Sequence, residues 1–279
     1  MNISNDMSPQ TIKIHSENDI FQILLAFKEN RQKRQKEKRF IFEGVRNIKN
    51  ALQSKWKIEA FVYSSEKELS NWAKGILRKS EANFHYELPL KLLKKLSDKE
   101  DVSELLVVAH MRGDNLQDIP VNANFLAVVF DRPSSPGNLG TLIRSADALG
   151  ANGLIITGHA VDLYDPETIR ATTGSFFSFP SVRLSSHQEL VAWIASLKKK
   201  MPDLQIVATD ETGDETIYDH DFRKTTILLV GNEKTGLSAA YKEMADTIVK
   251  IPIQGFASSL NVACASSVIL YEINRQRKR

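Results

Sequence analysis

The stretch FLAVVFDRPSSPGNLG, residues 125–140, passes from six consecutive apolar side chains into a polar loop rich in proline and glycine. A continuous apolar run of this kind is typical of a strand buried on both faces of a parallel sheet. Asn138 is a candidate N-cap residue, and apolar side chains follow it at helical spacing as far as Leu149. The stretch therefore predicts a strand, a loop and a helix of an α/β fold.

Toward the C-terminus the same alternation of apolar runs and helical patterns continues. Most of the runs are continuous, so we expect a mostly parallel sheet flanked by helices over residues 125–279. Ligands bind outside the carboxyl ends of the strands in such sheets, so the loops there should gather around one site. The further strands are predicted at Gly153–Thr157, Ile206–Thr209, Thr226–Val230 and Ile248–Ile253.

A smaller unit precedes this sheet. Residues 21–112 alternate short apolar runs with helical patterns, which predicts a small α/β domain. Residues 1–20 are polar and are expected to be flexible, and residues 113–124 contain the breaker residues of a linker. The apolar runs of the small domain are Phe40–Phe42, Ala60–Tyr63 and Leu105–Ala109.

The composition is that of a globular protein, with 42% hydrophobic residues, 25% charged residues and a net charge of +3. No apolar stretch approaches the ~18 residues of a membrane span, and the N-terminus lacks the pattern of a secretion signal. Cys264 is the single cysteine, so no intrachain disulfide is possible and a cytoplasmic location is expected. The six histidines show no metal-ligand spacing, so we predict no metal.

Basic side chains are concentrated between residues 28 and 39 of the small domain. Such a run attracts phosphate whatever the base sequence, and the alternative is a solvated helix face. The candidate RNA-binding residues are Arg31, Lys33, Arg34, Lys36, Lys38 and Arg39.

Two further loops follow predicted strands. The loop GNEKTGLS, residues 231–238, only superficially resembles a P-loop, because Leu237 stands where a lysine should follow the final glycine. Kinase and ATPase activities are therefore excluded. The third loop leads at Ser259 into a helix that is apolar or small nearly all round, which predicts burial in a tight interface. Cys264 lies in this helix and is expected to be a small core residue.

Three motifs in chain order resemble those of the SpoU/TrmH family, the RNA ribose 2′-O-methyltransferases of the SPOUT class. Residues 130–138 resemble in particular the avilamycin-resistance rRNA methyltransferases, and residues 40–52 resemble the small RNA-binding domain that many members carry. The match covers most of residues 35–275. The motifs are NLGTLIR at 138–144, GNEKTGLS at 231–238 and IPIQGFASSLNV at 251–262.

The resemblance implies a knotted α/β catalytic domain that forms a homodimer, with the helix from Ser259 onward at the interface. It also implies S-adenosylmethionine as the cofactor and RNA as the substrate. The catalytic residues that it implies are Arg144, Asn138, Glu233, Ser259 and Asn261. The cofactor pocket that it implies is built around Thr209, Gly231, Ile251 and Leu260.

The role of Arg144 follows from its chemistry. A guanidinium stays protonated at neutral pH, which makes it an awkward base for a ribose hydroxyl. We expect Arg144 to clamp an RNA phosphate and to stabilise the developing alkoxide. In the alternative, a contacting phosphate helps Arg144 to accept the proton directly. Glu233 is expected to orient Arg144, and Asn138 and Asn261 to position the site.

The substrate is the open question. A separate basic domain suits a large folded RNA, since phosphate contacts position an enzyme without reading sequence, and this favours rRNA over tRNA. The alternatives are a tRNA 2′-O-methyltransferase, a base methyltransferase, or a non-catalytic RNA-binding protein on the same scaffold. Intact motifs speak against the last. A core position for Cys264 excludes only methylation at a pyrimidine carbon.

Overall fold

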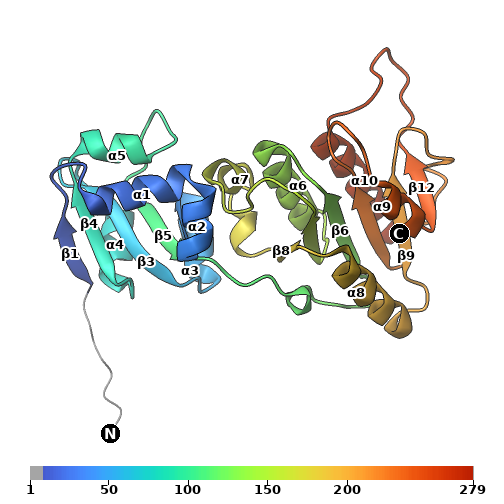
Figure 1. The fold of residues 1–279 in the computed structure, drawn as a ribbon, viewed down its shortest axis with the longest axis horizontal. Helices are drawn as coiled ribbons and strands as arrows, with labels where there is room; N and C mark the ends of the chain where they lie inside the picture. The colour runs from blue at the N-terminus through green and yellow to red at the C-terminus, as the bar shows by residue number, and fades with distance from the viewer. Residues whose placement is uncertain (1–8, 279) are drawn as a thin grey trace, which may run out of the picture. The chain divides into compact units, whose positions relative to one another are not determined.

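The computed structural model describes residues 9–278, which divide into two compact units (Figure 1). The N-terminal unit comprises the described residues up to Arg112 together with Tyr164–Arg170. The C-terminal unit comprises Gly113–Leu163 and the described residues from Ala171 onward. The division after Arg112 falls where the sequence predicts it. Tyr164–Arg170, which we expected in the catalytic domain, groups instead with the N-terminal unit.

The N-terminal unit contains a mixed five-stranded sheet. Its core lies between the sheet and two helices, α1 (Asp19–Glu29) and α5 (Leu90–Leu96), which bury Leu24 and Leu93 against it. The strands, in spatial order, are β1 (Gln10–Lys13), β4 (Phe84–Leu88), β3 (Ile58–Ser64), β5 (Leu106–His110) and β2 (Arg39–Glu43). The other helices are α2 (Arg31–Glu37), α3 (Val45–Gln53), α4 (Asn71–Lys79) and α7 (Pro166–Ala171), the last as far as Arg170.

The start of the chain is more ordered than the sequence predicts. Residues 1–8 lie outside the described residues, but Gln10–Lys13 form an edge strand that pairs in parallel with β4. Ile14 is fully buried, and the Asn18 side chain accepts a hydrogen bond from the Phe21 amide to cap α1. The expectation of a flexible segment is therefore wrong for residues 10–20, because one buried isoleucine and one cap fix them.

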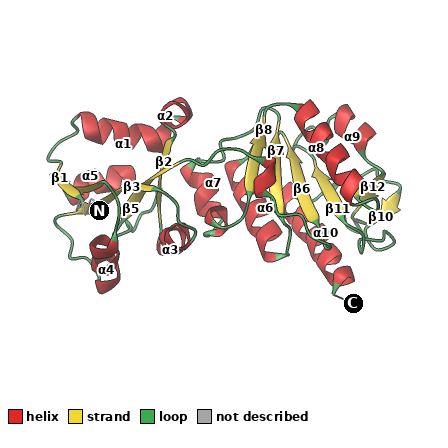
Figure 2. Ribbon diagram, turned by 90° about the horizontal axis from the view of Figure 1, so that it is seen from below, coloured by secondary structure: helices red, strands yellow, loops and turns green. Residues whose placement is uncertain are grey.

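The C-terminal unit is a seven-stranded sheet in which all pairs are parallel, as predicted, with helices on both faces (Figure 2). The central strands β6 and β11 are buried along their whole length. The strands, in spatial order, are β10 (Glu215–Thr216), β12 (Thr247–Lys250), β9 (Gln205–Thr209), β11 (Thr226–Val230), β6 (Leu126–Asp131), β7 (Gly153–Thr157) and β8 (Ser181–Leu184).

Four helices cover this sheet. On one face, α8 (His187–Lys200) and α9 (Ala239–Met244) join a core with alternate residues of the strands, such as Val129. Across the other, α6 (Pro136–Ala148) packs with α10 (Val262–Arg277), and the Ser145 and Ser267 hydroxyls are 2.7 Å apart. Two short 3₁₀ helices, Leu116–Asp118 and Ser175–Phe177, complete the unit. No helix within residues 9–278 has the length and apolar character that crossing a membrane would require.

Helix α6 begins three residues earlier than expected. Ser135 is its N-cap, since its hydroxyl accepts a hydrogen bond from the Asn138 amide, and Pro136 occupies the first turn. Proline suits this position because its fixed φ is helical and its missing N–H would be unpaired there. The prediction of Asn138 as N-cap is therefore wrong, and its side chain remains available for other contacts.

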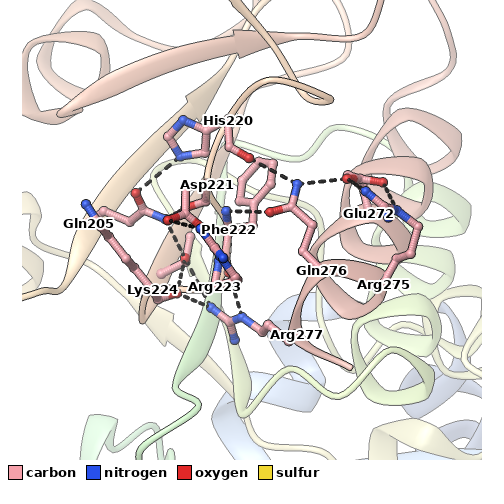
Figure 3. A network of polar contacts seen from close by, with 11 residues as sticks. Gln205, His220, Asp221, Phe222, Arg223, Lys224, Glu272, Arg275, Gln276 and Arg277 are labelled. Atoms are coloured by element: carbon pink, nitrogen blue, oxygen red, sulfur yellow. Dashed lines mark hydrogen bonds and ion pairs between the residues drawn. The ribbon is translucent and has the colours of Figure 1, made fainter. Parts of the chain in front are cut away.

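The last turn of α10 is anchored to the segment before β11 (Figure 3). The Arg277 guanidinium donates to the carbonyl oxygens of Phe222 and Lys224 in this segment, and also to that of Asn124, which precedes β6. The neighbouring Gln276 donates to the His220 carbonyl at 3.0 Å and accepts from the Phe222 amide at 2.9 Å. Burial lowers the pKa of Arg277 to about 10, which leaves it cationic at neutral pH.

We expect Arg277→Ala to lower the free energy of unfolding by about 2–4 kcal/mol. Hydrogen bonds to a charged group contribute about 1.5–3 kcal/mol, and carbonyls left without a partner add to the loss. The matched control is Arg223→Ala, because the Arg223 side chain is 74% exposed and pairs with Asp221 at the surface. Such a pair contributes about 0–1 kcal/mol. Urea denaturation measures both variants, and equal losses would show that Arg277 does not anchor α10.

Candidate active site

A cavity of about 670 Å³ opens at the carboxyl ends of β9, β11 and β12. The loops after these three strands form its walls, and Val262, Ala265 and Ile269 of α10 complete it. The structure thus brings together all four residues predicted for the cofactor pocket, which are Thr209, Gly231, Ile251 and Leu260.

The loop after β11 folds back so tightly that glycine is required at its start. A Cβ atom on Gly231 would overlap the backbone nitrogen of Leu237 and lie 2.5 Å from the carbonyl carbon of Gly236. The amide of Asn232 donates to the Gly236 carbonyl at 3.1 Å, and the Gly236 amide donates back at 3.0 Å. This wall of the cavity is therefore largely backbone, which lets a flat ligand approach closely.

The Glu233 carboxylate lies at the centre of a network that joins this loop to the loop after β6. It accepts hydrogen bonds from the Ser134 amide at 2.9 Å, the Ser134 hydroxyl at 2.7 Å and the Ser135 amide at 3.1 Å. The Asn138 side-chain amide donates to it at 3.2 Å. Three donors from the first loop and one from the first turn of α6 thus hold one carboxylate of the second loop.

The third loop joins the same network through Asn261. Its side-chain amide donates to the Asn138 side-chain oxygen at 3.0 Å, so Asn138 bridges Glu233 and Asn261. The Asn261 oxygen in turn accepts from the amides of Ala263 and Cys264 and caps α10. Three of the five predicted catalytic residues are therefore directly connected, and they tie all three motifs together.

The other two predicted catalytic residues stand apart from this network. Ser259 lines the cavity and is exposed. Arg144 is exposed on α6, and within residues 9–278 its side chain forms no hydrogen bond or ion pair. Within residues 9–278 Glu233 does not contact Arg144, because nearer donors on Ser134, Ser135 and Asn138 take its oxygens, and its expected role toward Arg144 stays a prediction. Arg144 follows Asn138 by six positions along the helix, a rise of about 9 Å.

Two family models match the chain. One is the SpoU rRNA Methylase family over residues 125–271, and the other is the SpoU L30e-like domain over residues 18–108. The chain belongs to the SpoU rRNA methylase family. As a member of it, the protein is an RNA methyltransferase, and the resemblance inferred from the three motifs is confirmed. The knotted topology expected for the C-terminal unit follows from this membership.

Individual relatives extend over nearly the whole chain. A 23S rRNA (uridine(2479)-2′-O)-methyltransferase from Streptomyces viridochromogenes is 44% identical over 273 residues, 98% of this chain and 95% of the relative. The crystal structure of the SpoU methyltransferase AviRb from the same organism, with the cofactor AdoMet bound, has a TM-score of 0.89 at 45% identity and covers 94% of this chain and 98% of that one. An AdoMet-bound rRNA methyltransferase from Sinorhizobium meliloti has a TM-score of 0.85 at 30% identity, over 95% and 98% of the two chains.

In this SpoU protein the charge state of Glu233 follows from its partners. Burial alone would raise the pKa of the carboxyl, but the hydrogen bonds from Ser134 and Asn138 outweigh burial and hold the pKa below its ordinary value. Glu233 is therefore a carboxylate at neutral pH, which suits a positioning acceptor and not a proton carrier.

The lowered pKa of Glu233 predicts a pH dependence of stability. A depressed carboxyl pKa contributes stability above the unfolded value, about 4.5, and that contribution is lost as the pH falls. We expect wild type to unfold at a higher temperature than Glu233→Gln at pH 7, with the gap closing below about pH 4.5. Thermal unfolding between pH 7 and 3.5 measures this, with Glu243→Gln as an exposed control. A gap that does not change with pH would contradict it.

Sequence reasoning missed several residues of the SpoU site. Ser134 and Ser135 gave no signal in the sequence, because their role depends on the Glu233 carboxylate, about 100 residues away.

Asp210 was missed as well. It directly follows β9 and lines the cavity with Lys242, whose ammonium nitrogen lies 2.7 Å from the Asp210 carboxylate. Burial would raise the pKa of Asp210, but Lys242 and Thr212 together lower it to about 2. An acidic residue at a strand's carboxyl end was a signal that could have been used.

The structure divides the predicted RNA-binding residues. Arg34 is 1% exposed, and its guanidinium donates to the carbonyls of Phe27 and Lys28 and pairs with Asp165 at 3.2 Å. The prediction of Arg34 as an RNA contact is therefore wrong. Lys33 and Arg39 are partly buried and pair with Glu37 and Glu59. The residues of the set that are exposed are Arg31, Lys36 and Lys38.

Cys264 also differs from expectation. It is exposed, not a core residue, because it lies on the side of α10 that the C-terminal unit does not cover. Val268 and Tyr271 follow it at helical spacing and are 41% and 61% exposed. The small-residue helix is therefore buried on one side only.

Proposed function

We propose that this chain transfers a methyl group from S-adenosylmethionine to a ribose 2′-hydroxyl of 23S ribosomal RNA. The observation that carries the proposal is the backbone-walled cavity beside the Glu233–Asn138–Asn261 network. The network joins the three family motifs, and two of the three motifs also line the cavity. The 44% identical relative is named for methylation of a 23S rRNA uridine, so we favour a uridine as the target.

The residues present fit this cofactor. The sharp backbone turn at Gly231 leaves room for a flat ring system, and apolar Ile251 and Leu260 line the same cavity. When bound, S-adenosylmethionine supplies an electrophilic methyl group. The Asn261 side-chain amide donates to the Asn138 side-chain oxygen, and Asn138 in turn donates to Glu233, which lines the cavity. Arg144 keeps an unpaired cationic side chain with which to bind an RNA phosphate and stabilise the developing alkoxide.

The test uses methyl-labelled S-adenosylmethionine with separate pools of unmodified 23S rRNA and tRNA, followed by alkaline digestion. A ribose methyl blocks alkaline cleavage at its own nucleotide, so we expect label in alkali-resistant dinucleotides from the 23S rRNA pool. Label in mononucleotides would mean base methylation, and label confined to tRNA would mean a different substrate. Either result, or no transfer to 23S rRNA, overturns the proposal.

A homodimer through α10 is part of the same proposal. The exposed face formed by Cys264, Val268 and Tyr271 supports it, because apolar side chains on one helix face favour burial against a partner. We expect Val268→Glu to convert a dimer to a monomer in analytical ultracentrifugation. The control is Val191→Glu, since Val191 is 43% exposed on α8. A wild-type monomer would contradict the dimer.

We further propose that the enzyme acts in the cytoplasm.

A further inference from the structure

Two adjacent residues at the end of β6 form hydrogen bonds with both ends of the loop after β11. Asp131 is 2% exposed, and one of its oxygens accepts a hydrogen bond from the Ser238 amide at 3.0 Å. The backbone carbonyl of Arg132 accepts from the Asn232 side-chain amide. Residues 232 and 238 bracket the loop that lines the cavity, so its two ends are fixed to residues 131 and 132.

The Arg132 guanidinium reaches the middle of the same loop. Its Nη2 donates to the Gly236 carbonyl at 3.1 Å, and its Nη1 lies 3.4 Å from the Thr235 hydroxyl. The other edge of the guanidinium forms a fork with Asp131, with Nε at 3.1 Å from both oxygens and Nη2 at 2.9 Å from one. A planar group with several donors is needed to satisfy both sides at once.

The backbone is strained to make this possible. Arg132 has a φ of 50°, in the left-handed region that non-glycine residues adopt only at an energetic cost. Its side-chain stem runs so close to Gly158 that a Cβ there would lie 2.5 Å from the Arg132 Cγ. Such strain persists only where surrounding contacts over-determine it, and functional loops are where it is usually found.

We propose that Arg132 is a positioning residue for the cofactor. Held by Asp131, it sets the shape of the loop from Asn232 to Gly236 and so the wall against which S-adenosylmethionine binds. Arg132 itself does not line the cavity. The inference rests on cofactor use, but it does not depend on which RNA is methylated.

The decisive variant is Arg132→Lys. Lysine keeps a positive charge for the buried Asp131, so the protein should fold, but a single ammonium cannot span Asp131, Gly236 and Thr235 together. We expect the Kd for S-adenosylhomocysteine and the KM for S-adenosylmethionine to rise at least tenfold. At saturating cofactor, kcat should change by less than about threefold, and the melting temperature should stay within about 3 °C of wild type.

Two further variants of this chain serve as comparisons for Arg132→Lys. Arg132→Ala leaves Asp131 buried without its charged partner, so it should lose cofactor affinity and stability together. Arg223→Ala removes a guanidinium from an exposed Asp–Arg pair in the same unit and should change neither. Isothermal titration with S-adenosylhomocysteine measures affinity without RNA, so the result stands apart from the methylation assay. Wild-type affinity in Arg132→Lys, or a melting temperature lowered without loss of affinity, would overturn the proposal.

Discussion

Arg144→Ala is expected to lower kcat for RNA methylation by about 10²–10³-fold, the range found when one donor to a developing oxyanion is removed. The Arg144 side chain has no hydrogen bond or ion pair within residues 9–278, so its loss should leave the melting temperature and the affinity for S-adenosylmethionine unchanged. Single-turnover methylation at saturating cofactor measures the effect. Arg223→Ala, another exposed arginine of the same unit, is the control.

Two outcomes would refine or overturn this prediction. A loss of less than fivefold would show that Arg144 does not act on the reacting atoms. In Arg144→Lys, a retained rate would argue against bidentate clamping of a phosphate, since lysine offers only a point charge. If Asn138→Ala also loses activity, mixing it with Arg144→Ala tests the dimer as well. Restored activity would mean that the two residues act together across two copies of the chain.

Gly231→Ala is expected to weaken cofactor binding by at least 100-fold, about 2.7 kcal/mol. Its methyl group would collide with the backbone at Gly236 and Leu237, so the loop has to open and the wall of the cavity has to move. Titration with S-adenosylhomocysteine measures the loss directly.

The matched control for Gly231→Ala is Gly75→Ala in α4. A Cβ on Gly75 meets nothing within 4 Å, so the substitution should leave binding unchanged. It should also stabilise the protein by about 0.5–1 kcal/mol, because alanine favours a helix interior. Normal cofactor affinity in Gly231→Ala would mean that the tight turn is not part of the cofactor's wall.

The sequence predicts the sheet of the C-terminal unit well because its central strands are continuous apolar runs. It misses β8, whose four residues alternate between buried and half-buried, and β10, which has only two residues. In the N-terminal unit it misses β1 and β4, which lie together at one side of the sheet and carry mostly partly exposed side chains. Short or half-exposed strands carry too little apolar signal to distinguish them from loops.

The site could be predicted as a set of residues but not as a set of contacts. Asn138, Glu233 and Asn261 do meet, because parallel strands bring their loops to one edge. The predicted Glu233–Arg144 pairing does not form, since nothing in the sequence shows that backbone amides of Ser134 and Ser135 reach Glu233 first. Likewise, the sequence does not distinguish Arg34 from its basic neighbours, because its burial and its ion pair with Asp165 depend on the fold.

The last wall of the cavity comes from α10, the helix that Arg277 anchors. A growing chain that has been synthesised only as far as β12 already holds the motifs after β6 and β11 and the loop after β9, yet it lacks Val262, Ala265 and Ile269. Cofactor binding therefore comes late in biosynthesis, after α10 has emerged and docked. For an enzyme that modifies ribosomal RNA, this order means that a chain fragment ending at β12 carries much of the site but lacks a complete cofactor pocket.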